Sequence, residues 1–161
     1  MGKLDNKVAI ITGGSGGIGQ AAARLFTSEG AKVMLVDLNH DALAKVAHSI
    51  GEDKIAYMAA DVTDAEQVKG YIAKTVERFG GVDVTLLNAG IEGKIAFIQD
   101  QGDDDFDKVM AVNVRGVWLG MKYAMPEMAK RGGGSIVITS STAGIRAVPK
   151  LSPYIASKHA V

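Results

Sequence analysis

The chain has 161 residues, enough for one domain with a substantial core, and 47% of them are apolar. Its 18 basic and 18 acidic residues cancel, which argues against nucleic acid or an anionic membrane as a partner. It has no cysteine, no histidines at metal-ligand spacing, no apolar run of the roughly 18 residues that a membrane helix needs and no signal peptide, so we expect a cytoplasmic protein without a metal.

Strand-like and helix-like segments alternate along the chain. Short β-branched runs predict strands, and longer stretches with one apolar face predict helices. In chain order these are strand 7–12, helix 17–29, strand 32–36, helix 41–50, strand 54–59, a helix from a cap at Asp64 to residue 79, strand 82–87, a long helix 104–131, strand 135–139 and a last helix capped by Ser152. Apolar rather than alternating strands indicate a parallel sheet covered by helices. The pattern predicts one domain over residues 1–161, a Rossmann-type doubly wound α/β fold with strand order 3-2-1-4-5 and helices on both faces.

A glycine-rich segment joins the first predicted strand to the first predicted helix. Glycines there permit a tight turn and let the backbone approach a pyrophosphate, while the start of the helix offers free N–H groups. A flexible turn is the simpler alternative, but a position at the start of a strand–helix–strand unit favours nucleotide binding. The segment reads Thr12-Gly13-Gly14-Ser15-Gly16-Gly17-Ile18-Gly19.

Asp37 closes the second predicted strand, at about the distance from Gly19 expected for the acid that binds the adenine ribose. A carboxylate there accepts a hydrogen bond from a 2′-OH and repels a 2′-phosphate. No lysine or arginine stands in residues 37–41 or in the glycine segment. The sequence therefore favours NAD over NADP, although an ordinary exposed aspartate at a strand end is the alternative interpretation.

Tyr154 and Lys158 are four residues apart at the start of the last predicted helix, on one helix face. A lysine ammonium stabilises a nearby phenolate, so such a tyrosine can exchange the proton that accompanies hydride transfer. Ser141 follows the fifth strand, where folds of this type place their ligands, and its hydroxyl could hold a substrate oxygen. Asn113 falls on the apolar stripe of the long helix, where a buried amide needs partners. Each of these residues could also be merely structural.

These motifs together resemble those of the classical short-chain dehydrogenases/reductases, in the order typical of that family. The matching residues lie between 7 and 158. Leu87 stands where the family usually has an asparagine, and because it continues an apolar strand we expect little effect. The motifs are Thr12-Gly13-x-x-x-Gly17-Ile18-Gly19, Asp61-Val62, Asn88-Ala89-Gly90, Asn113, Ser141 and Tyr154-x-x-x-Lys158.

The resemblance implies a role for each matching residue. Tyr154 would be the acid/base, Lys158 would assist it and bind the nicotinamide ribose, and Ser141 would hold the substrate oxygen. Asn113 would keep a proton-relay water next to Lys158. Asp61 and Val62 would lie at the adenine, Asn88-Ala89-Gly90 behind the adenosine ribose, and Ile18 beside the pyrophosphate and nicotinamide. The predicted cofactor-binding residues are Thr12, Gly13, Ser15, Gly17, Ile18, Gly19, Asp37, Leu38, Asp61, Val62, Asn88, Ala89, Gly90, Tyr154 and Lys158.

The resemblance also implies an oxidoreductase that transfers a hydride between NAD(H) and a secondary alcohol or ketone. Ile95, Phe97, Ile145 and Val148, in the loops 91–102 and 144–151, hint at an apolar pocket and a hydrophobic or cyclic substrate. Two alternatives stay open. A 3-oxoacyl-(acyl-carrier-protein) reductase would usually favour NADPH, and a non-catalytic nucleotide-binding domain would usually have lost the tyrosine or the lysine.

Family members continue well beyond the last predicted helix, whereas this chain stops at Val161. We therefore expect that a C-terminal third is absent and that these 161 residues are not a complete working enzyme. The fifth strand has no later strand to pair with, and Lys158 lies close to the chain end. The long helix carries more apolar residues than covering a sheet requires, which together with the resemblance predicts a homo-oligomer, either a dimer or a tetramer. These residues are Val117, Trp118, Met121, Met125 and Met128.

Overall fold

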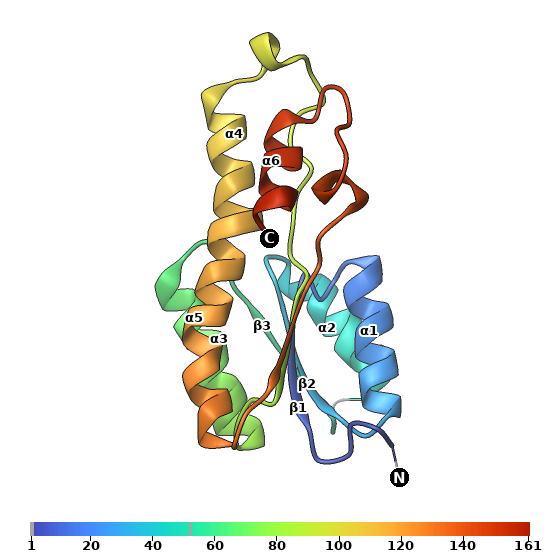
Figure 1. Ribbon diagram of the computed structural model, residues 1–161. Coiled ribbons are helices and arrows are strands. Elements are labelled where there is room, and N and C mark those ends of the chain that lie inside the picture. The colour runs from blue at the N-terminus through green and yellow to red at the C-terminus, as the bar shows by residue number, and fades with distance from the viewer. Residues whose placement is uncertain (1, 52) are drawn as a thin grey trace.

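The computed structural model describes residues 2–51 and 53–161, and they form a five-stranded parallel sheet between two layers of helices (Figure 1). The strand order is β3-β2-β1-β4-β5, which confirms the predicted order. The strands are β1 (Val8–Thr12), β2 (Lys32–Asp37), β3 (Ile55–Ala59), β4 (Val84–Leu87) and β5 (Ser135–Ile138). The helices are α1 (Gly17–Ser28), α2 (His40–Ile50), α3 (Ala65–Phe79), α4 (Asp103–Met110), α5 (Gly116–Lys130) and α6 (Ser152–Ala160), with 3₁₀ turns at Ile98–Asp100 and Thr142–Gly144.

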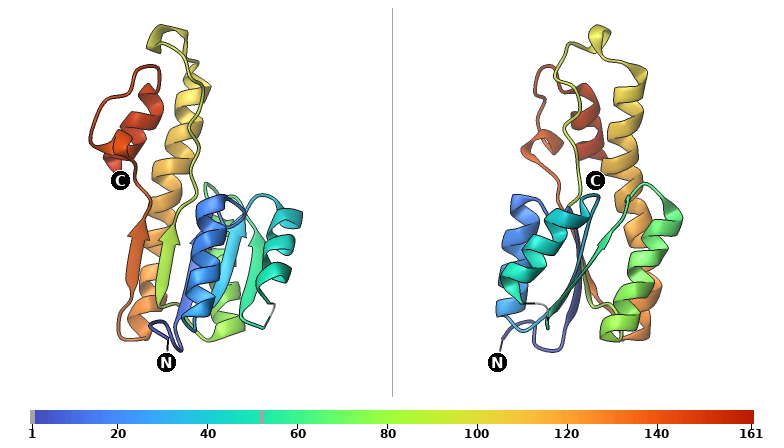
Figure 2. Two further views of the ribbon diagram at one scale, coloured as in Figure 1. Left: turned by 90° about the vertical axis from the view of Figure 1, so that its right-hand side faces the viewer. Right: turned by 180° about the vertical axis from the view of Figure 1, so that it is seen from behind.

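Two apolar cores cover the two faces of the sheet. Successive side chains of β1 point to opposite faces, so Ile11 packs with residues of α1 and α2 while Ile10 packs with residues of α3 and α5. Figure 2 shows these two helix layers on either side of the strands. All of β1 is buried, as expected for a strand in the middle of a parallel sheet. The two edge strands are less buried: β3 is mostly half-buried, and in β5 Val137 keeps 47% of its surface exposed.

The long helix predicted over 104–131 is interrupted. It runs as α4, a π-helical segment at Ala111–Arg115 and then α5, and Figure 1 shows these parts as one continuous rod. A π turn inserts one residue into the helical repeat, and such insertions are common at functional sites. Asn113 lies in the middle of the π-helical segment and is fully buried. The irregularity therefore occurs at the one polar residue predicted on the apolar stripe.

Helix starts follow the predicted signals, with one correction. Asp64 caps α3 as predicted, because its carboxylate accepts the N–H groups of Glu66 and Gln67. Ser152 was expected to cap the last helix, but it is the first residue of α6 and Leu151 precedes it as the cap. The hydroxyl of Ser152 donates a hydrogen bond to the Gln101 side chain instead of serving as a cap. Other boundaries differ from the prediction by one or two residues, which is ordinary for helix and strand ends.

The segments that follow β4 and β5 rise above the C-terminal edge of the sheet. There they lie beside α4 and α6, which project beyond the strands on the same side (Figure 2). The carboxyl ends of the strands, where ligands bind in sheets of this topology, therefore face a second group of helices and loops. No helix in the described part of the chain is long and apolar enough to cross a membrane.

Candidate active site

Thr12 ties the end of β1 to the segment that follows β4. The chain leaves β1 toward β2 and β3 and returns to β4 on the other side, so the strand order reverses here. The Thr12 hydroxyl accepts the N–H groups of Asn88 at 3.0 Å and Ala89 at 3.1 Å. Asn88 also donates to the Thr12 carbonyl at 3.2 Å and accepts from the Thr139 hydroxyl at 3.1 Å. One amide side chain thus joins the ends of β1, β4 and β5.

The glycine segment has the shape of an anion cradle. Gly13 has φ +66°, and a Cβ there would come within 2.9 Å of the Asn88 amide nitrogen, so glycine is required. A Cβ at Gly17 would meet no described protein atom within 4 Å, which means that this position faces open space. In the described structure, α1 begins without a side-chain cap or an acidic residue in its first turn. Its N–H groups and positive dipole end are therefore available to a phosphate.

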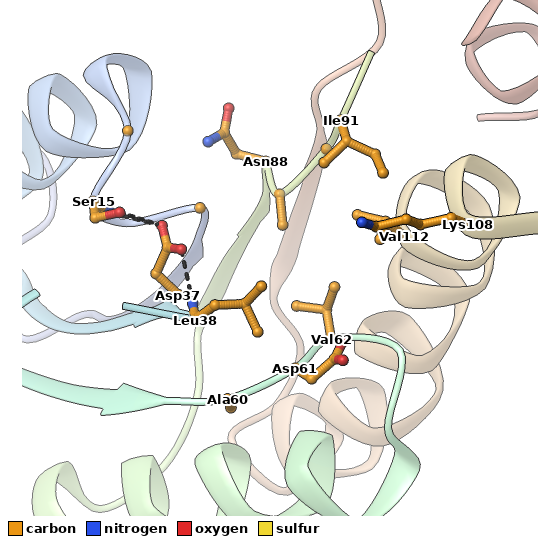
Figure 3. A pocket seen from close by; sticks show the side chains of 14 residues that line it. Ser15, Asp37, Leu38, Ala60, Asp61, Val62, Asn88, Ile91, Lys108 and Val112 are labelled. Carbon is orange, nitrogen blue, oxygen red and sulfur yellow. Dashed lines mark hydrogen bonds between the residues drawn. The ribbon is translucent and has the colours of Figure 1, made fainter. Parts of the chain in front are cut away.

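Asp37, at the end of β2, is bonded to the glycine segment and lines with it a cavity of about 390 Å³ (Figure 3). One carboxylate oxygen accepts the Ser15 N–H at 3.0 Å and the Ser15 hydroxyl at 2.6 Å, and the other accepts the Leu38 N–H at 2.7 Å. These bonds fix the direction of the carboxylate. Nine predicted cofactor residues line this cavity: Gly13, Ser15, Asp37, Leu38, Asp61, Val62, Asn88, Ala89 and Gly90.

The far wall of this cavity comes from α4 and the segment after it, which the sequence reasoning missed. Lys108 and Val112 line it, together with Ile91 (Figure 3). Lys108 and Val112 are four residues apart and so share one face of the helix. Lys108 is the one basic side chain among the described residues of this lining, opposite the carboxylates of Asp37 and Asp61. The sequence feature that could have indicated this wall is the position of Val112, directly before the predicted site residue Asn113.

A second cavity of about 470 Å³ is lined by three of the four predicted catalytic residues. Ser141, Tyr154 and Lys158 line one side of it, and Gly17 and Ile18 at the start of α1 line the other. Gly16, Asn88, Gly90 and Ile91 line both cavities, so the two adjoin across the glycine segment. The site therefore extends from Asp37 at the end of β2 to Tyr154 on α6.

Lys158 is the buried cation of this second cavity. Its side chain is 6% exposed, and its Nζ donates to the Thr139 carbonyl at 2.8 Å. Burial lowers the pKa of the Lys158 ammonium below its usual 10.5, because desolvation disfavours the charged form. The Nζ lies 5.7 Å from the centre of the Tyr154 ring, one helical turn away. The fold thus keeps an ammonium beside the phenol.

Asn113 and Lys158 approach each other at Gly90. The Asn113 Oδ1 accepts the Ile91 N–H at 2.8 Å, and its Nδ2 donates to the Ile91 carbonyl at 2.9 Å and to the Ser157 hydroxyl at 3.0 Å. A Cβ on Gly90 would lie 3.3 Å from Asn113 Oδ1 and 3.5 Å from Lys158 Nζ. Asn113 therefore has a structural role at the π-helical segment and also lies next to the lysine, so both interpretations of this residue fit the geometry.

The two serines after β5 differ in their contacts. The Ser141 hydroxyl oxygen accepts the Ala143 N–H at 3.1 Å, which leaves its own hydrogen to donate into the cavity. The Ser140 hydroxyl donates to the Lys158 carbonyl at 2.9 Å and is committed to α6. These contacts favour Ser141 over Ser140 as the residue that would hold a substrate oxygen.

Some predicted residues lie outside both cavities. Thr12, Gly19 and Asn113 lie behind the walls and shape them, since a Cβ at Gly19 would overlap the Gly13 carbonyl. The apolar loop residues do not line the second cavity either: Ile95, Phe97 and Ile145 are more than half exposed, and Ile91 and Glu92 line it instead. The exposed apolar side chains of these loops therefore do not form the lining of the second cavity, whose apolar lining residues include Ile18 and Ile91.

Comparison with known proteins agrees with this geometry. The family model described as short chain dehydrogenase matches residues 7–161. Short-chain dehydrogenase reductase 3a of Arabidopsis thaliana is 44% identical over 160 residues, and levodione reductase of Leifsonia aquatica is 39% identical over 163 residues. These alignments cover 99% of this chain but 62% and 61% of the two relatives, so the chain spans about three fifths of their length.

Solved structures give the same result. The crystal structure of levodione reductase matches with a TM-score of 0.94 and 38% identity, over 98% of this chain and 63% of that one. The crystal structure of NAD⁺-bound xylitol dehydrogenase matches with a TM-score of 0.95 and 36% identity, over 98% and 62%. The extent of the family match and the identity of these relatives show that the chain belongs to the short-chain dehydrogenase/reductase family.

Proposed function

We propose that the protein transfers a hydride between NAD(H) and a secondary alcohol or ketone. One observation carries the proposal: Tyr154 and Lys158 line the same cavity as Gly17 and Ile18, at the free N-terminus of α1. A group that reaches Tyr154 can therefore lie next to a cofactor whose phosphates are bound by α1. The bound nicotinamide would supply or accept the hydride.

The proton would be handled by residues of this chain. In ketone reduction, the Tyr154 hydroxyl donates its proton to the carbonyl oxygen, and in alcohol oxidation the phenolate takes the proton back. The Lys158 ammonium stabilises the phenolate that forms, and burial strengthens this interaction because water screens it less. The Ser141 hydroxyl donates to the same substrate oxygen and holds it beside the phenol.

The choice of NAD rests on Asp37. Its carboxylate is already directed by Ser15 and Leu38 and would accept the 2′-OH of an adenine ribose, whereas a 2′-phosphate there would meet a negative charge. Lys108 lies on the opposite wall, and its positive charge is the feature that would favour the 2′-phosphate of NADP. NAD⁺ in the xylitol dehydrogenase structure supports the proposal by analogy.

The substrate would be hydrophobic or cyclic. The loops that follow β4 and β5 carry exposed apolar side chains, with Phe97 at 55%, Ile95 at 63% and Ile145 at 79% exposure. Exposed apolar side chains on loops that follow the carboxyl ends of the strands are available to contact an apolar ligand. Levodione reductase and zerumbone synthase, both about 40% identical to this chain, are relatives consistent with such substrates.

The test is turnover by the purified full-length protein with NAD⁺ and with NADP⁺ on a panel of cyclic and linear secondary alcohols, followed by the absorbance of the reduced nicotinamide. We expect turnover with NAD⁺ that is highest for cyclic alcohols and is lost in Tyr154→Phe. Preference for NADPH and for thioester-linked acyl substrates would favour the carrier-protein reductase. Tight NAD binding without turnover on any substrate would favour a non-catalytic domain.

A further inference from the structure

One side chain connects the two loops beside the catalytic cavity. Gln101 lies just before α4 and is half-buried. Its Nε2 donates to the carbonyls of Lys94 at 3.3 Å, Ala96 at 3.2 Å and Lys150 at 3.2 Å, and its Oε1 accepts the Ser152 hydroxyl. Two N–H groups thus serve three carbonyls, so both donors of the amide are committed to the protein, and its oxygen accepts one bond from Ser152. With no donor left for a ligand, the amide acts through the segments it holds.

The two segments that Gln101 joins are far apart in sequence. Residues 94–96 follow β4, and residues 150–152 lead directly into α6. Two further contacts join them: the Ala96 N–H donates to the Lys150 carbonyl at 3.1 Å, and the Lys150 ammonium lies 4.8 Å from the centre of the Phe97 ring. Gln101 therefore lies at the centre of the contact between the two loops.

The backbone at Lys150 needs this support. Lys150 has φ +68°, a left-handed conformation that a residue with a side chain adopts only where its surroundings hold it. Its carbonyl accepts both the Ala96 N–H and the Gln101 side chain. Without Gln101, the exposed loop would lose one of the contacts that keep Lys150 in this conformation.

The start of α6 depends on the same contact. α6 has nine residues, and in the described structure no side chain caps its N-terminus, because the Ser152 hydroxyl is directed to Gln101. A helix this short is marginal unless tertiary contacts hold it. Tyr154 lies two residues after Ser152, in the first turn of the helix. The position of the phenol therefore follows the position of the Ser152–Gln101 contact.

We propose that Gln101 is a positioning residue for Tyr154: by tying Lys150 and Ser152 to residues 94–96, it sets the place of the first turn of α6 relative to the substrate loop. The proposal rests on the proposed function, because positioning matters only if Tyr154 transfers the proton. Gln101 lines neither cavity, so its replacement should leave cofactor binding intact. Small displacements of a reacting group are costly to the chemical step.

The test, in the full-length protein, compares Gln101→Leu with Gln99→Leu, the same substitution at an exposed position two residues away. We expect Gln101→Leu to lower kcat by about tenfold or more, with the dissociation constant of NAD unchanged, and Gln99→Leu to change neither. Limited trypsin digestion should cut after Arg146 and Lys150 faster in Gln101→Leu than in the other two proteins. Equal kcat and equal cleavage in all three proteins would overturn the proposal.

A second variant covers the case in which Gln101→Leu does not fold. Ser152→Ala removes only the bond to Oε1, and we expect a smaller fall in kcat of the same kind, with no further loss when it is combined with Gln101→Leu. If the falls in kcat of the two single variants added up in the double variant, Gln101 and Ser152 would not act through the same contact, and the proposal would be overturned. A wild-type protein without turnover would contradict the proposed function, and the digestion rates would then still decide whether Gln101 holds the loop.

Discussion

The hydroxyl of Ser15 donates a hydrogen bond of 2.6 Å to the carboxylate of Asp37, and the main-chain N–H of Ser15 donates another of 3.0 Å to the same oxygen. The glycine segment after β1 thus holds the acid at the end of β2. Two elements that would contact different parts of a dinucleotide, the phosphates and the ribose, are joined before any ligand arrives. This preorganisation lowers the entropy cost of binding a ribose at Asp37.

Replacing Asp37 tests the cofactor preference. We expect Asp37→Ala to weaken NAD binding about tenfold, because a charged hydrogen bond to the ribose is lost, and to narrow the preference over NADP. Adding Leu38→Arg should further narrow the preference for NAD over NADP or reverse it. Ser15→Ala should also weaken NAD binding, but by less than Asp37→Ala. Calorimetric dissociation constants for both cofactors check this, with exposed Asp41→Ala as the control. Equal or tighter binding of NADP by the wild type would contradict the preference.

Tyr154→Phe removes only the hydroxyl and tests the acid/base assignment. We expect the rate to fall by about 10²- to 10⁴-fold while the fold and NAD affinity are kept, since general acid–base catalysis contributes about that much. Ser141→Ala should lower kcat clearly more than Ser140→Ala, because the Ser140 hydroxyl is committed to the Lys158 carbonyl. Substantial turnover by Tyr154→Phe at every pH would exclude the mechanism.

The sequence was sufficient for the sheet and the glycine cradle because their signals are local. Apolar runs predict buried strands, and a glycine such as Gly13, with its positive φ, is required by the backbone itself. Asp64 was predictable as a cap for the same reason, since it bonds only to the two residues that follow. Interactions between residues that are close in the sequence can therefore be predicted from the sequence alone.

The missed features depend on contacts between distant segments. Lys108 on α4 and Val112 on the π-helical segment line the cavity beside Asp37, and only the folded topology brings them there. Ser152 was predicted as a cap from its position before a proline, but Gln101, 51 residues earlier, takes its hydroxyl. The π-helical segment around Asn113 left only a buried polar residue as its signal. A local sequence pattern does not show which residues that are far apart in the sequence come into contact in the fold.

The exposed apolar residues of α5 test the predicted assembly. Val117 and Met128 are buried against the sheet, whereas Trp118 is 51% exposed and Met125 is 56% exposed. We expect the full-length protein to be a dimer or tetramer at micromolar concentration, and Trp118→Glu should shift it toward the monomer, because a charge would be buried in an apolar contact. Light scattering measures this. Leu25→Glu, at an equally exposed apolar position on α1, is the control, and a monomeric wild type would contradict the prediction.

Asp83 connects the starts of β1 and β4 with the end of α5, and its replacement should reduce stability. It accepts the Val8 N–H at 2.8 Å and the Arg131 Nε at 2.9 Å. Burial raises the pKa of the Asp83 carboxyl, but these hydrogen bonds and the charges of Arg131 and Lys7 outweigh burial and hold it below its usual 3.8. Since Arg131 is one-third exposed, we expect Asp83→Asn to lower the free energy of unfolding by about 2 kcal/mol.

The effect of Asp83→Asn should depend on pH. A carboxyl whose pKa is lowered by folding stabilises the native state above its unfolded pKa of 3.8, and this contribution is lost as pH falls through the lower folded pKa. Urea unfolding at neutral and acid pH should therefore show wild type and variant differing at neutral pH and converging in acid. A difference that stays constant with pH would indicate that packing, and not charge, is lost. Glu77→Gln on the exposed face of α3 is the control.

Lys158 should also make stability rise with pH, but in the alkaline range. Burial lowers the pKa of its ammonium below 10.5, so the folded state binds this proton less tightly than the unfolded state does. Between the two pKa values the unfolded chain holds more protons, and stability therefore rises with pH through that window. We expect wild type to gain stability relative to Lys158→Met as pH rises toward 10.5. The difference between the two proteins is the quantity to measure, because other lysines and tyrosines titrate equally in both. A difference that falls as pH rises would show that the buried ammonium is stabilised rather than penalised, with its bond to the Thr139 carbonyl outweighing the loss of hydration.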